Sequence, residues 1–214
     1  MHKNRIKSVM KWMSRIWFHI THPFAKVLCG RNVLLRGVRI NSNGGVYIYL
    51  GNDVSVNHMQ VLATGKNNRV IIHEGCKLCN LTCWMEGDGN VIEIGANTII
   101  HGATQLAACD GSTINIGQNC LFSHDIYVRT TDSHSILDDS GRRINMEEDI
   151  TIGNHVWIGM QSLILKGVTI PDNCIVGARS TVTKTYFESN SIVAGSPART
   201  IRQNISWKTE RMPI

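Results

Sequence analysis

Aliphatic residues recur at every sixth position in the C-terminal half of the chain. The positions are Ile152, Ile158, Ile164, Ile170, Val176 and Val182. A period of six suits neither an α-helix, which turns every 3.6 residues, nor a strand, whose side chains alternate. It suits a left-handed parallel β-helix, in which each of three flat sides turns one aliphatic residue inward. We therefore predict an all-β, three-sided prism with a continuous core of stacked aliphatics.

A second repeat, of 22 residues, precedes this region. Its first members are Leu50, Ile72, Ile94 and Ile116. Each of them opens a run of three apolar residues spaced by six, and these runs end at Leu62, Trp84, Leu106 and Val128. About eighteen residues complete a three-sided coil, so four residues remain in each repeat. They form turns rich in Gly, Asn and Asp at residues 65–68, 87–90 and 109–112, as positive φ angles require. We predict the same prism with a protrusion at one corner of each early coil.

The repeat stops between Val128 and Ile152. The segment 133–149 has no periodicity and, with Asp132 before it, is the most charged stretch of the body. A polar excursion from a regular solenoid is typical of a functional loop. The repeat fades after Val182, and residues 192–197 end the prism. We expect a short C-terminal helix within residues 198–208 to cap its open end.

The N-terminal segment differs from the body in pattern and in charge. Residues 3–20 predict an amphipathic helix, since their apolar positions are spaced by three and four. Residues 1–26 hold six basic side chains and no acidic one, whereas residues 27–214 hold 16 of each. Two interpretations stay open: docking on the body or a neighbouring subunit, or contact with an anionic membrane. We expect a basic helical segment at 1–26, a β-helix domain at 27–198 and a C-terminal cap at 199–214.

Composition argues against several classes of protein. No apolar run reaches the roughly 18 residues of a membrane span, and we expect no signal peptide. The charge of +6 is confined to the N-terminal segment, so we expect no nucleic-acid partner.

The seven irregularly spaced cysteines indicate reduced thiols in a cytoplasmic protein. Cys76, Cys120 and Cys174 each follow an inward aliphatic by four residues, which predicts core fillers, and we expect no metal.

Three motifs stand in order along the chain. They are RTTDSHSI at 129–136, IGNHVWIG at 152–159, and VGARSTVTK at 176–184 followed by AGSPAR at 194–199. Together they resemble the hexapeptide-repeat O-acetyltransferases, in the galactoside and maltose acetyltransferase branch that includes enzymes of capsule, O-antigen and polysialic acid. The resemblance covers about residues 45–203 and leaves out the N-terminal helix. The Asp-Ser-His motif is more characteristic of the polysaccharide-modifying members.

This resemblance implies acetyl transfer from acetyl-CoA to a sugar hydroxyl of a bacterial surface polysaccharide. It also implies a homotrimer with active sites between neighbouring prisms, and no metal. The chemistry is consistent, because a sugar hydroxyl needs a base to take its proton as it attacks, and histidine suits that role near neutral pH. A backbone N–H can stabilise the oxyanion of the tetrahedral intermediate.

The family's functional positions are carried over residue by residue. His134 matches the general base. Asp132 is expected to orient His134 or to bind the acceptor, and Trp157 to lie near the acetyl group and acceptor. Seven further positions match CoA-binding residues, of which the last two suit phosphates: Gly159, Met160, Ala178, Thr183, Lys184, Arg199 and Arg202. Related enzymes often have a smaller residue at Met160, so the role of its side chain stays open.

Other functions remain as alternatives. The same frame serves small-molecule acetyltransferases that act on nucleotide sugars, serine or antibiotics. A metalloenzyme like the γ-class carbonic anhydrases, or a purely structural β-helix subunit, is a further alternative. His124 is the nearest competitor for the base. We also hypothesise that the N-terminal helix keeps a cytoplasmic trimer near the inner face of the membrane. The sequence does not name the sugar or the hydroxyl.

Overall fold

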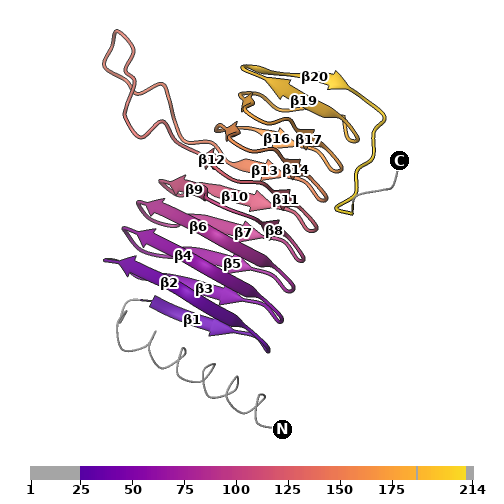
Figure 1. Cartoon of the computed structure of the whole chain (residues 1–214). Helices are drawn as coiled ribbons and strands as arrows, with labels where there is room; N and C mark the ends of the chain where they lie inside the picture. The colour runs from indigo at the N-terminus through magenta and orange to yellow at the C-terminus, as the bar shows by residue number, and fades with distance from the viewer. Residues whose placement is uncertain (1–24, 187, 211–214) are drawn as a thin grey trace.

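The computed structural model describes residues 25–186 and 188–210, which form a three-sided parallel β-solenoid (Figure 1). The predicted all-β prism is therefore confirmed. The expected N-terminal helix lies outside the described residues. Within the described ranges, no helix is long and apolar enough to cross a membrane.

The first side of the prism is a seven-stranded parallel sheet with one strand from each coil. Its strands are β1 (Ala25–Cys29), β3 (Val46–Leu50), β5 (Asn68–Ile72), β7 (Val91–Ile94), β10 (Thr113–Ile116), β13 (Ile150–Ile152) and β16 (Thr169–Ile170). Leu50 pairs in register with Ile72, Ile72 with Ile94, and Ile94 with Ile116. The 22-residue repeat is thus the length of one early coil.

The second and third sides belong to one 13-stranded sheet that bends around a corner. In the early coils, single long strands run over both sides: β2 (Leu34–Ser42), β4 (Ser55–Ala63) and β6 (Lys77–Glu86). Later coils divide them. The second side then has β8 (Ile99–Ile100), β11 (Leu121–Phe122), β14 (Trp157–Ile158), β17 (Ile175–Val176) and β19 (Ile192–Gly195), and the third has β9 (Thr104–Cys109), β12 (Ile126–Arg129), β15 (Leu163–Ile164) and β18 (Thr181–Val182).

The core is the predicted column of inward side chains. All six aliphatics of the C-terminal period, Ile152 to Val182, are buried. Cys76, Cys120 and Cys174 are buried as well, as predicted. The Cys76 thiol donates to the Gly95 carbonyl, and the Cys120 thiol to that of Gly153. Burial raises the pKa of both thiols to about 11, so they stay protonated near neutral pH.

One part of the predicted register is wrong. Trp84 was expected to point inward with Leu106, but Cys83 pairs with Leu106 and Trp84 is 43% exposed. The reason is a shorter side: Leu78 and Cys83 are five residues apart and both inward, with Asn80 in the left-handed region at the corner (φ 51°). The same shift turns Leu62 outward one coil earlier, where its neighbour Val61 is buried instead.

The predicted corner protrusions are present and stack on one edge of the prism, where the third side meets the first. A ladder of buried polar side chains joins them. The Asn68 Oδ1 accepts from the Asn90 backbone N–H at 3.0 Å and side-chain Nδ2 at 2.9 Å, and the Asn90 Oδ1 accepts from the Gly111 N–H. Ser112 Oγ lies 2.6 Å from Thr130 Oγ1. The ladder ends at Thr130, where the excursion begins.

The excursion between β12 and β13 leaves the prism as a long arm (Figure 1). Asp138 organises its tip, because its carboxylate accepts from the Ser140 hydroxyl and from the Arg142 guanidinium. Four large apolar side chains on the arm are more than half exposed: Ile136, Leu137, Ile144 and Met146. Such apolar exposure on a projecting arm is typical of a surface that contacts another protein.

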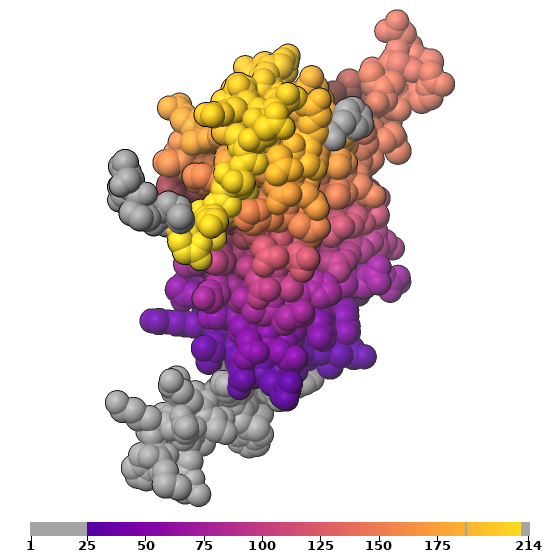
Figure 2. Space-filling model, turned by 90° about the vertical axis from the view of Figure 1, so that its right-hand side faces the viewer, coloured from indigo at the N-terminus to yellow at the C-terminus, as the bar shows by residue number. Residues whose placement is uncertain are grey.

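The prediction of a C-terminal helix is wrong. Residues 198–202 form strand β20 (Ala198–Arg202), which pairs antiparallel with β19. The edge of β19 would otherwise leave unpaired backbone groups at the end of the solenoid, and β20 hydrogen-bonds to them. The chain then runs back down one face, as the yellow segment in Figure 2 shows. Trp207 anchors it by stacking on His155, with ring centroids 4.0 Å apart.

Candidate active site

Asn145 holds the root of the excursion together. It is buried and lies near the end of the excursion, where the chain returns to the prism. The Asn145 Nδ2 donates to Asp132 Oδ2 at 2.9 Å and to the His134 carbonyl oxygen at 2.8 Å. Its Oδ1 accepts from the Ile136 N–H at 2.7 Å. One amide group therefore fixes the Asp132 carboxylate and the backbone at His134 and Ile136.

The turn just before His134 is strained. Ser133 has φ of 67°, a region that costs energy for residues other than glycine. Its N–H donates to Thr131 Oγ1 at 3.0 Å, and its hydroxyl accepts from the Arg129 Nη2 at 2.8 Å. These contacts hold the turn that presents His134.

Asp132 is fixed as a carboxylate. Lys166 Nζ donates to its Oδ2 at 2.6 Å and to the Met146 carbonyl at 3.0 Å. The hydrogen bond from Lys166, followed by that from Asn145, lowers the pKa of Asp132 below its ordinary value. Among the described residues no hydrogen bond joins the Asp132 carboxylate to the His134 imidazole, and the two residues are linked through the Asn145 amide.

The His134 side chain is exposed in the single chain. Within residues 25–186 and 188–210, no hydrogen bond occupies its ring nitrogens. His124, the competing histidine, is also exposed and pairs with Asp125 at 3.2 Å. Of the two, only His134 has its backbone fixed by a buried side chain.

Trp157 lies on the second side of the prism, away from the excursion root. It is 38% exposed, and its Nε1 donates to Ser123 Oγ at 3.4 Å. The Trp207 ring lies 6.0 Å from the Trp157 ring, at 45°. The C-terminal segment therefore borders the exposed face of Trp157.

Gly159 and Met160 form the corner after Trp157. A Cβ on Gly159 would lie 2.6 Å from the Ala178 nitrogen, so the close approach of the next coil requires glycine there. The Arg179 N–H donates to the Met160 carbonyl, which stacks Ala178 beside this corner. Three of the predicted CoA positions, Gly159, Met160 and Ala178, are thus brought together.

The other predicted CoA positions lie elsewhere on the prism. Thr183 and Lys184 are exposed after β18, on the same edge as Asp132, and the Lys184 ammonium lies 5.7 Å from the Tyr186 ring centroid. Arg199 and Arg202 are exposed on β20. The Arg199 Nη1 donates to the Ala198 carbonyl.

The single chain therefore holds two separate groups of candidate residues. Asp132 and His134 occupy the edge between the third and first sides, whereas Trp157, Gly159 and Met160 occupy the second side and the next corner. The three sides of one prism face in different directions, so these groups do not meet within a chain. Among the described residues, no group of three or more His, Cys, Asp or Glu could hold a metal ion.

Two residues of the site were missed by sequence reasoning. Asn145 has no periodicity around it that would mark it. Lys166 could have been found, because it follows the inward Ile164 by two residues, as Thr130 follows Val128. Val128 and Ile164 pair in register, so Lys166 had to lie beside the root of the excursion.

Three comparisons with known proteins bear on this geometry. A sequence model of the bacterial transferase hexapeptide family (six repeats) matches residues 149–184. A polysialic acid O-acetyltransferase of Neisseria meningitidis is 36% identical over 169 residues, covering 78% of this chain and 77% of its own. The galactoside O-acetyltransferase of Escherichia coli strain K12 is 38% identical over 117 residues, covering 54% of this chain and 55% of its own.

The solved structures agree with the sequence comparisons. The crystal structure of a polysialic acid O-acetyltransferase matches with a TM-score of 0.73 and 28% identity, over 88% of this chain and 92% of that one. The match therefore extends over nearly the whole described solenoid.

Proposed function

Because the chain belongs to the hexapeptide-repeat O-acetyltransferases, we propose that it transfers an acetyl group from acetyl-CoA to a sugar hydroxyl of a bacterial surface polysaccharide. The relative and the solved structure with polysialic acid in their names support an acidic polysaccharide as acceptor. The observation that carries the proposal is the Asn145 lock, which fixes Asp132 and the backbone of His134 on a projecting arm.

In this mechanism His134 is the general base. Its imidazole takes the proton of the acceptor hydroxyl as that oxygen attacks the thioester carbonyl. The tetrahedral intermediate then collapses, the carbon–sulfur bond breaks, and the CoA sulfur leaves with the proton returned by the imidazolium. The negative charge of Asp132 stabilises the imidazolium at a distance, and Lys166 holds the Asp132 carboxylate in place.

The backbone at Met160 is the proposed donor to the oxyanion. The N–H groups on either side of it are engaged: that of Gly159 donates to the Val176 carbonyl, and that of Gln161 to the His124 carbonyl. Among the described residues, no backbone acceptor lies against the Met160 N–H. A preorganised N–H of this kind stabilises developing negative charge.

We further propose that the active enzyme is a homotrimer. His134 and the Met160 corner lie on different sides of one prism, so a complete site requires His134 of one copy and the Met160 corner of another. The exposed apolar side chains of the excursion support contact between copies. Trp157, beside that corner, would face the acceptor, and Ala178, Thr183, Lys184, Arg199 and Arg202 would contact CoA.

The test is thiol release from acetyl-CoA with polysialic acid, a galactoside and chloramphenicol as alternative acceptors. We expect transfer to polysialic acid, and a loss of at least about a thousandfold in kcat for His134→Ala. CoA binding and trimer mass should stay unchanged in that variant. Near-normal turnover by a folded His134→Ala trimer would refute the base, and transfer to chloramphenicol alone would refute the polysaccharide acceptor.

A further inference from the structure

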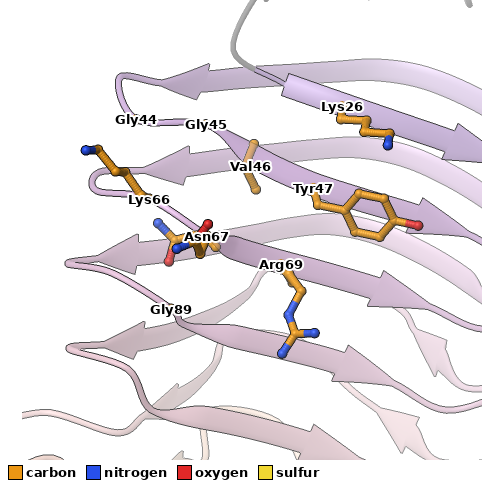
Figure 3. A pocket seen from close by; sticks show the side chains of 10 residues that line it. Lys26, Gly44, Gly45, Val46, Tyr47, Lys66, Asn67, Arg69 and Gly89 are labelled. Atoms are coloured by element: carbon orange, nitrogen blue, oxygen red, sulfur yellow. The ribbon is translucent and has the colours of Figure 1, made fainter.

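A basic groove lies on the early coils, well below the excursion. Its cavity volume is about 680 Å³, and its lining includes three cationic residues, Lys26, Lys66 and Arg69, but among the described residues no carboxylate (Figure 3). The body of the chain is neutral overall, with 16 basic and 16 acidic residues between 27 and 214. A carboxylate-free groove with three cations is therefore a local concentration of positive charge.

The cations are arranged along the solenoid axis. Lys26, Tyr47 and Arg69 occupy one ladder on successive strands β1, β3 and β5, since Lys26 pairs with Tyr47 and Tyr47 with Arg69. Lys26 Nζ lies 5.9 Å from the Tyr47 ring centroid. Successive strands are about 4.8 Å apart. The groove thus offers a cation, an aromatic ring and a cation in a row.

The wall of the groove is built by the corner protrusions. Gly44, Lys66 and Gly89 come from three successive protrusions, and Figure 3 shows them beside the strands that carry Tyr47 and Arg69. Asp88 precedes Gly89 in this wall, and its Oδ1 accepts from the Lys66 backbone N–H at 2.7 Å. The later coils lack these protrusions, so the wall belongs to the early coils.

The groove and the excursion share one edge of the prism. The polar ladder runs along that edge from Asn68, next to Arg69, to Thr130, two residues before Asp132. The two ends are three coils apart, which is about 14 Å along the axis. A chain of a few sugar units bound in the groove could therefore extend along the edge toward His134.

We propose that this groove binds the acceptor polymer, and that the acceptor is a carboxylated polysaccharide. The sugar carboxylates would pair with Lys26, Lys66 and Arg69, while Tyr47 contacts a sugar ring. This assignment rests on the proposed function, because it concerns the acceptor of the same site. It makes the groove an anchoring site that raises affinity for long acidic chains and leaves the chemical step unchanged.

The experiment measures binding directly, on the full-length protein in the absence of acetyl-CoA. The probes are size-fractionated polysialic acid, a uronic acid polymer and neutral dextran. The groove variant is Lys26→Gln with Lys66→Gln and Arg69→Gln. Its matched control is Arg36→Gln with Arg39→Gln and Lys77→Gln, which removes the same charge from exposed positions on the other sides of the early coils.

We expect the groove variant to bind polysialic acid about tenfold more weakly, as three exposed ion pairs predict, and the control variant less than about twofold. Acidic polymers should bind less tightly as salt rises, and dextran should not bind. His134→Ala should bind like the wild type. In turnover, the groove variant should raise KM for long chains, with kcat nearly unchanged.

Equal losses in the two triple variants, or no loss in the groove variant, would overturn the assignment. So would equally tight binding of single-stranded DNA or anionic vesicles to the groove, or the absence of binding by every acidic polymer. If transfer to a neutral sugar is then still observed, the acetyltransferase proposal stands without the groove. If the groove binds acidic polymer but no acetyl transfer to any sugar occurs, the binding assignment stands and the proposed function fails.

Discussion

Asn145 is the residue on which the geometry around His134 depends most. Its side-chain amide makes four hydrogen bonds, to Arg143 and to Asp132, His134 and Ile136 on the opposite half of the excursion, and Asn145 is 8% exposed. Removing it leaves the His134 carbonyl and the Ile136 N–H without their partner, so the excursion should move as a unit.

We expect Asn145→Ala to lower kcat by about a hundredfold, because misplacing a catalytic group by an ångström has effects of that size. The KM for acetyl-CoA should change little, since Asn145 makes no hydrogen bond to a proposed CoA position. Hydrogen exchange of the excursion should quicken in the same variant. Ser135→Ala, at an exposed position of the same arm, is the control, and equal kinetics in the two variants would contradict a positioning role for Asn145.

The ion pair between Lys166 and Asp132 predicts a pH dependence. Lys166 lowers the pKa of Asp132 in the folded state. The stability from this pair is therefore complete above the ordinary aspartate pKa of about 3.9, and is lost as pH falls through the lower folded value. The Tm difference between wild type and Asp132→Asn should be constant above about pH 5 and shrink in acid. A Tm difference that grows in acid would mean that folding raises the pKa of Asp132 and would contradict this prediction.

At the scale of the element, the six-residue period predicted the sides because each flat side needs one inward aliphatic. The period failed at Trp84 because the chain itself is ambiguous there. Cys83 and Trp84 are adjacent and both apolar, so a side shortened by one residue leaves the pattern apparently intact. Only the backbone conformation at Asn80 decides between them.

The shorter side leads to a contrast in stability between two aromatic residues. Phe122 is fully buried and Trp84 is 43% exposed. We expect Phe122→Ala to destabilise the fold by about 3–5 kcal/mol, and Trp84→Ala by less than about 1 kcal/mol. Denaturation should be followed at one fixed protein concentration, because subunit association changes apparent stability. A larger loss of stability in Trp84→Ala than in Phe122→Ala would indicate that Trp84 points into the core.

The C-terminal strand shows a second limit of sequence reasoning. Ala198–Arg202 has no period of its own, and nothing local says that it returns beside β19. Its pairing follows from an unpaired edge, which exists only once the solenoid has formed. The motif marks His134 as a candidate, and its role stays a prediction. The hydrogen bonds of Asn145 join residues across an aperiodic loop, which no sequence pattern indicated.

At the scale of the whole molecule, the charge divides the chain into a neutral body and a basic N-terminal segment. Residues 1–26 carry six basic side chains and lie almost entirely outside the described residues. We expect the full-length protein to bind anionic vesicles at low salt and to leave them as salt rises. Replacing Lys3, Lys7 and Lys11 by Gln should weaken that binding. If the wild-type protein does not bind such vesicles at low salt, the membrane hypothesis is wrong.

Strand β20 also closes the C-terminal end of the solenoid. A solenoid with an open parallel edge could template a further copy end to end, and so on into a filament. Here the last strand runs in the reverse direction and places Arg199 and Arg202 along its length. Their charges and the reversed strand polarity oppose the addition of a coil at this end, so end-to-end stacking of two copies through β20 is disfavoured.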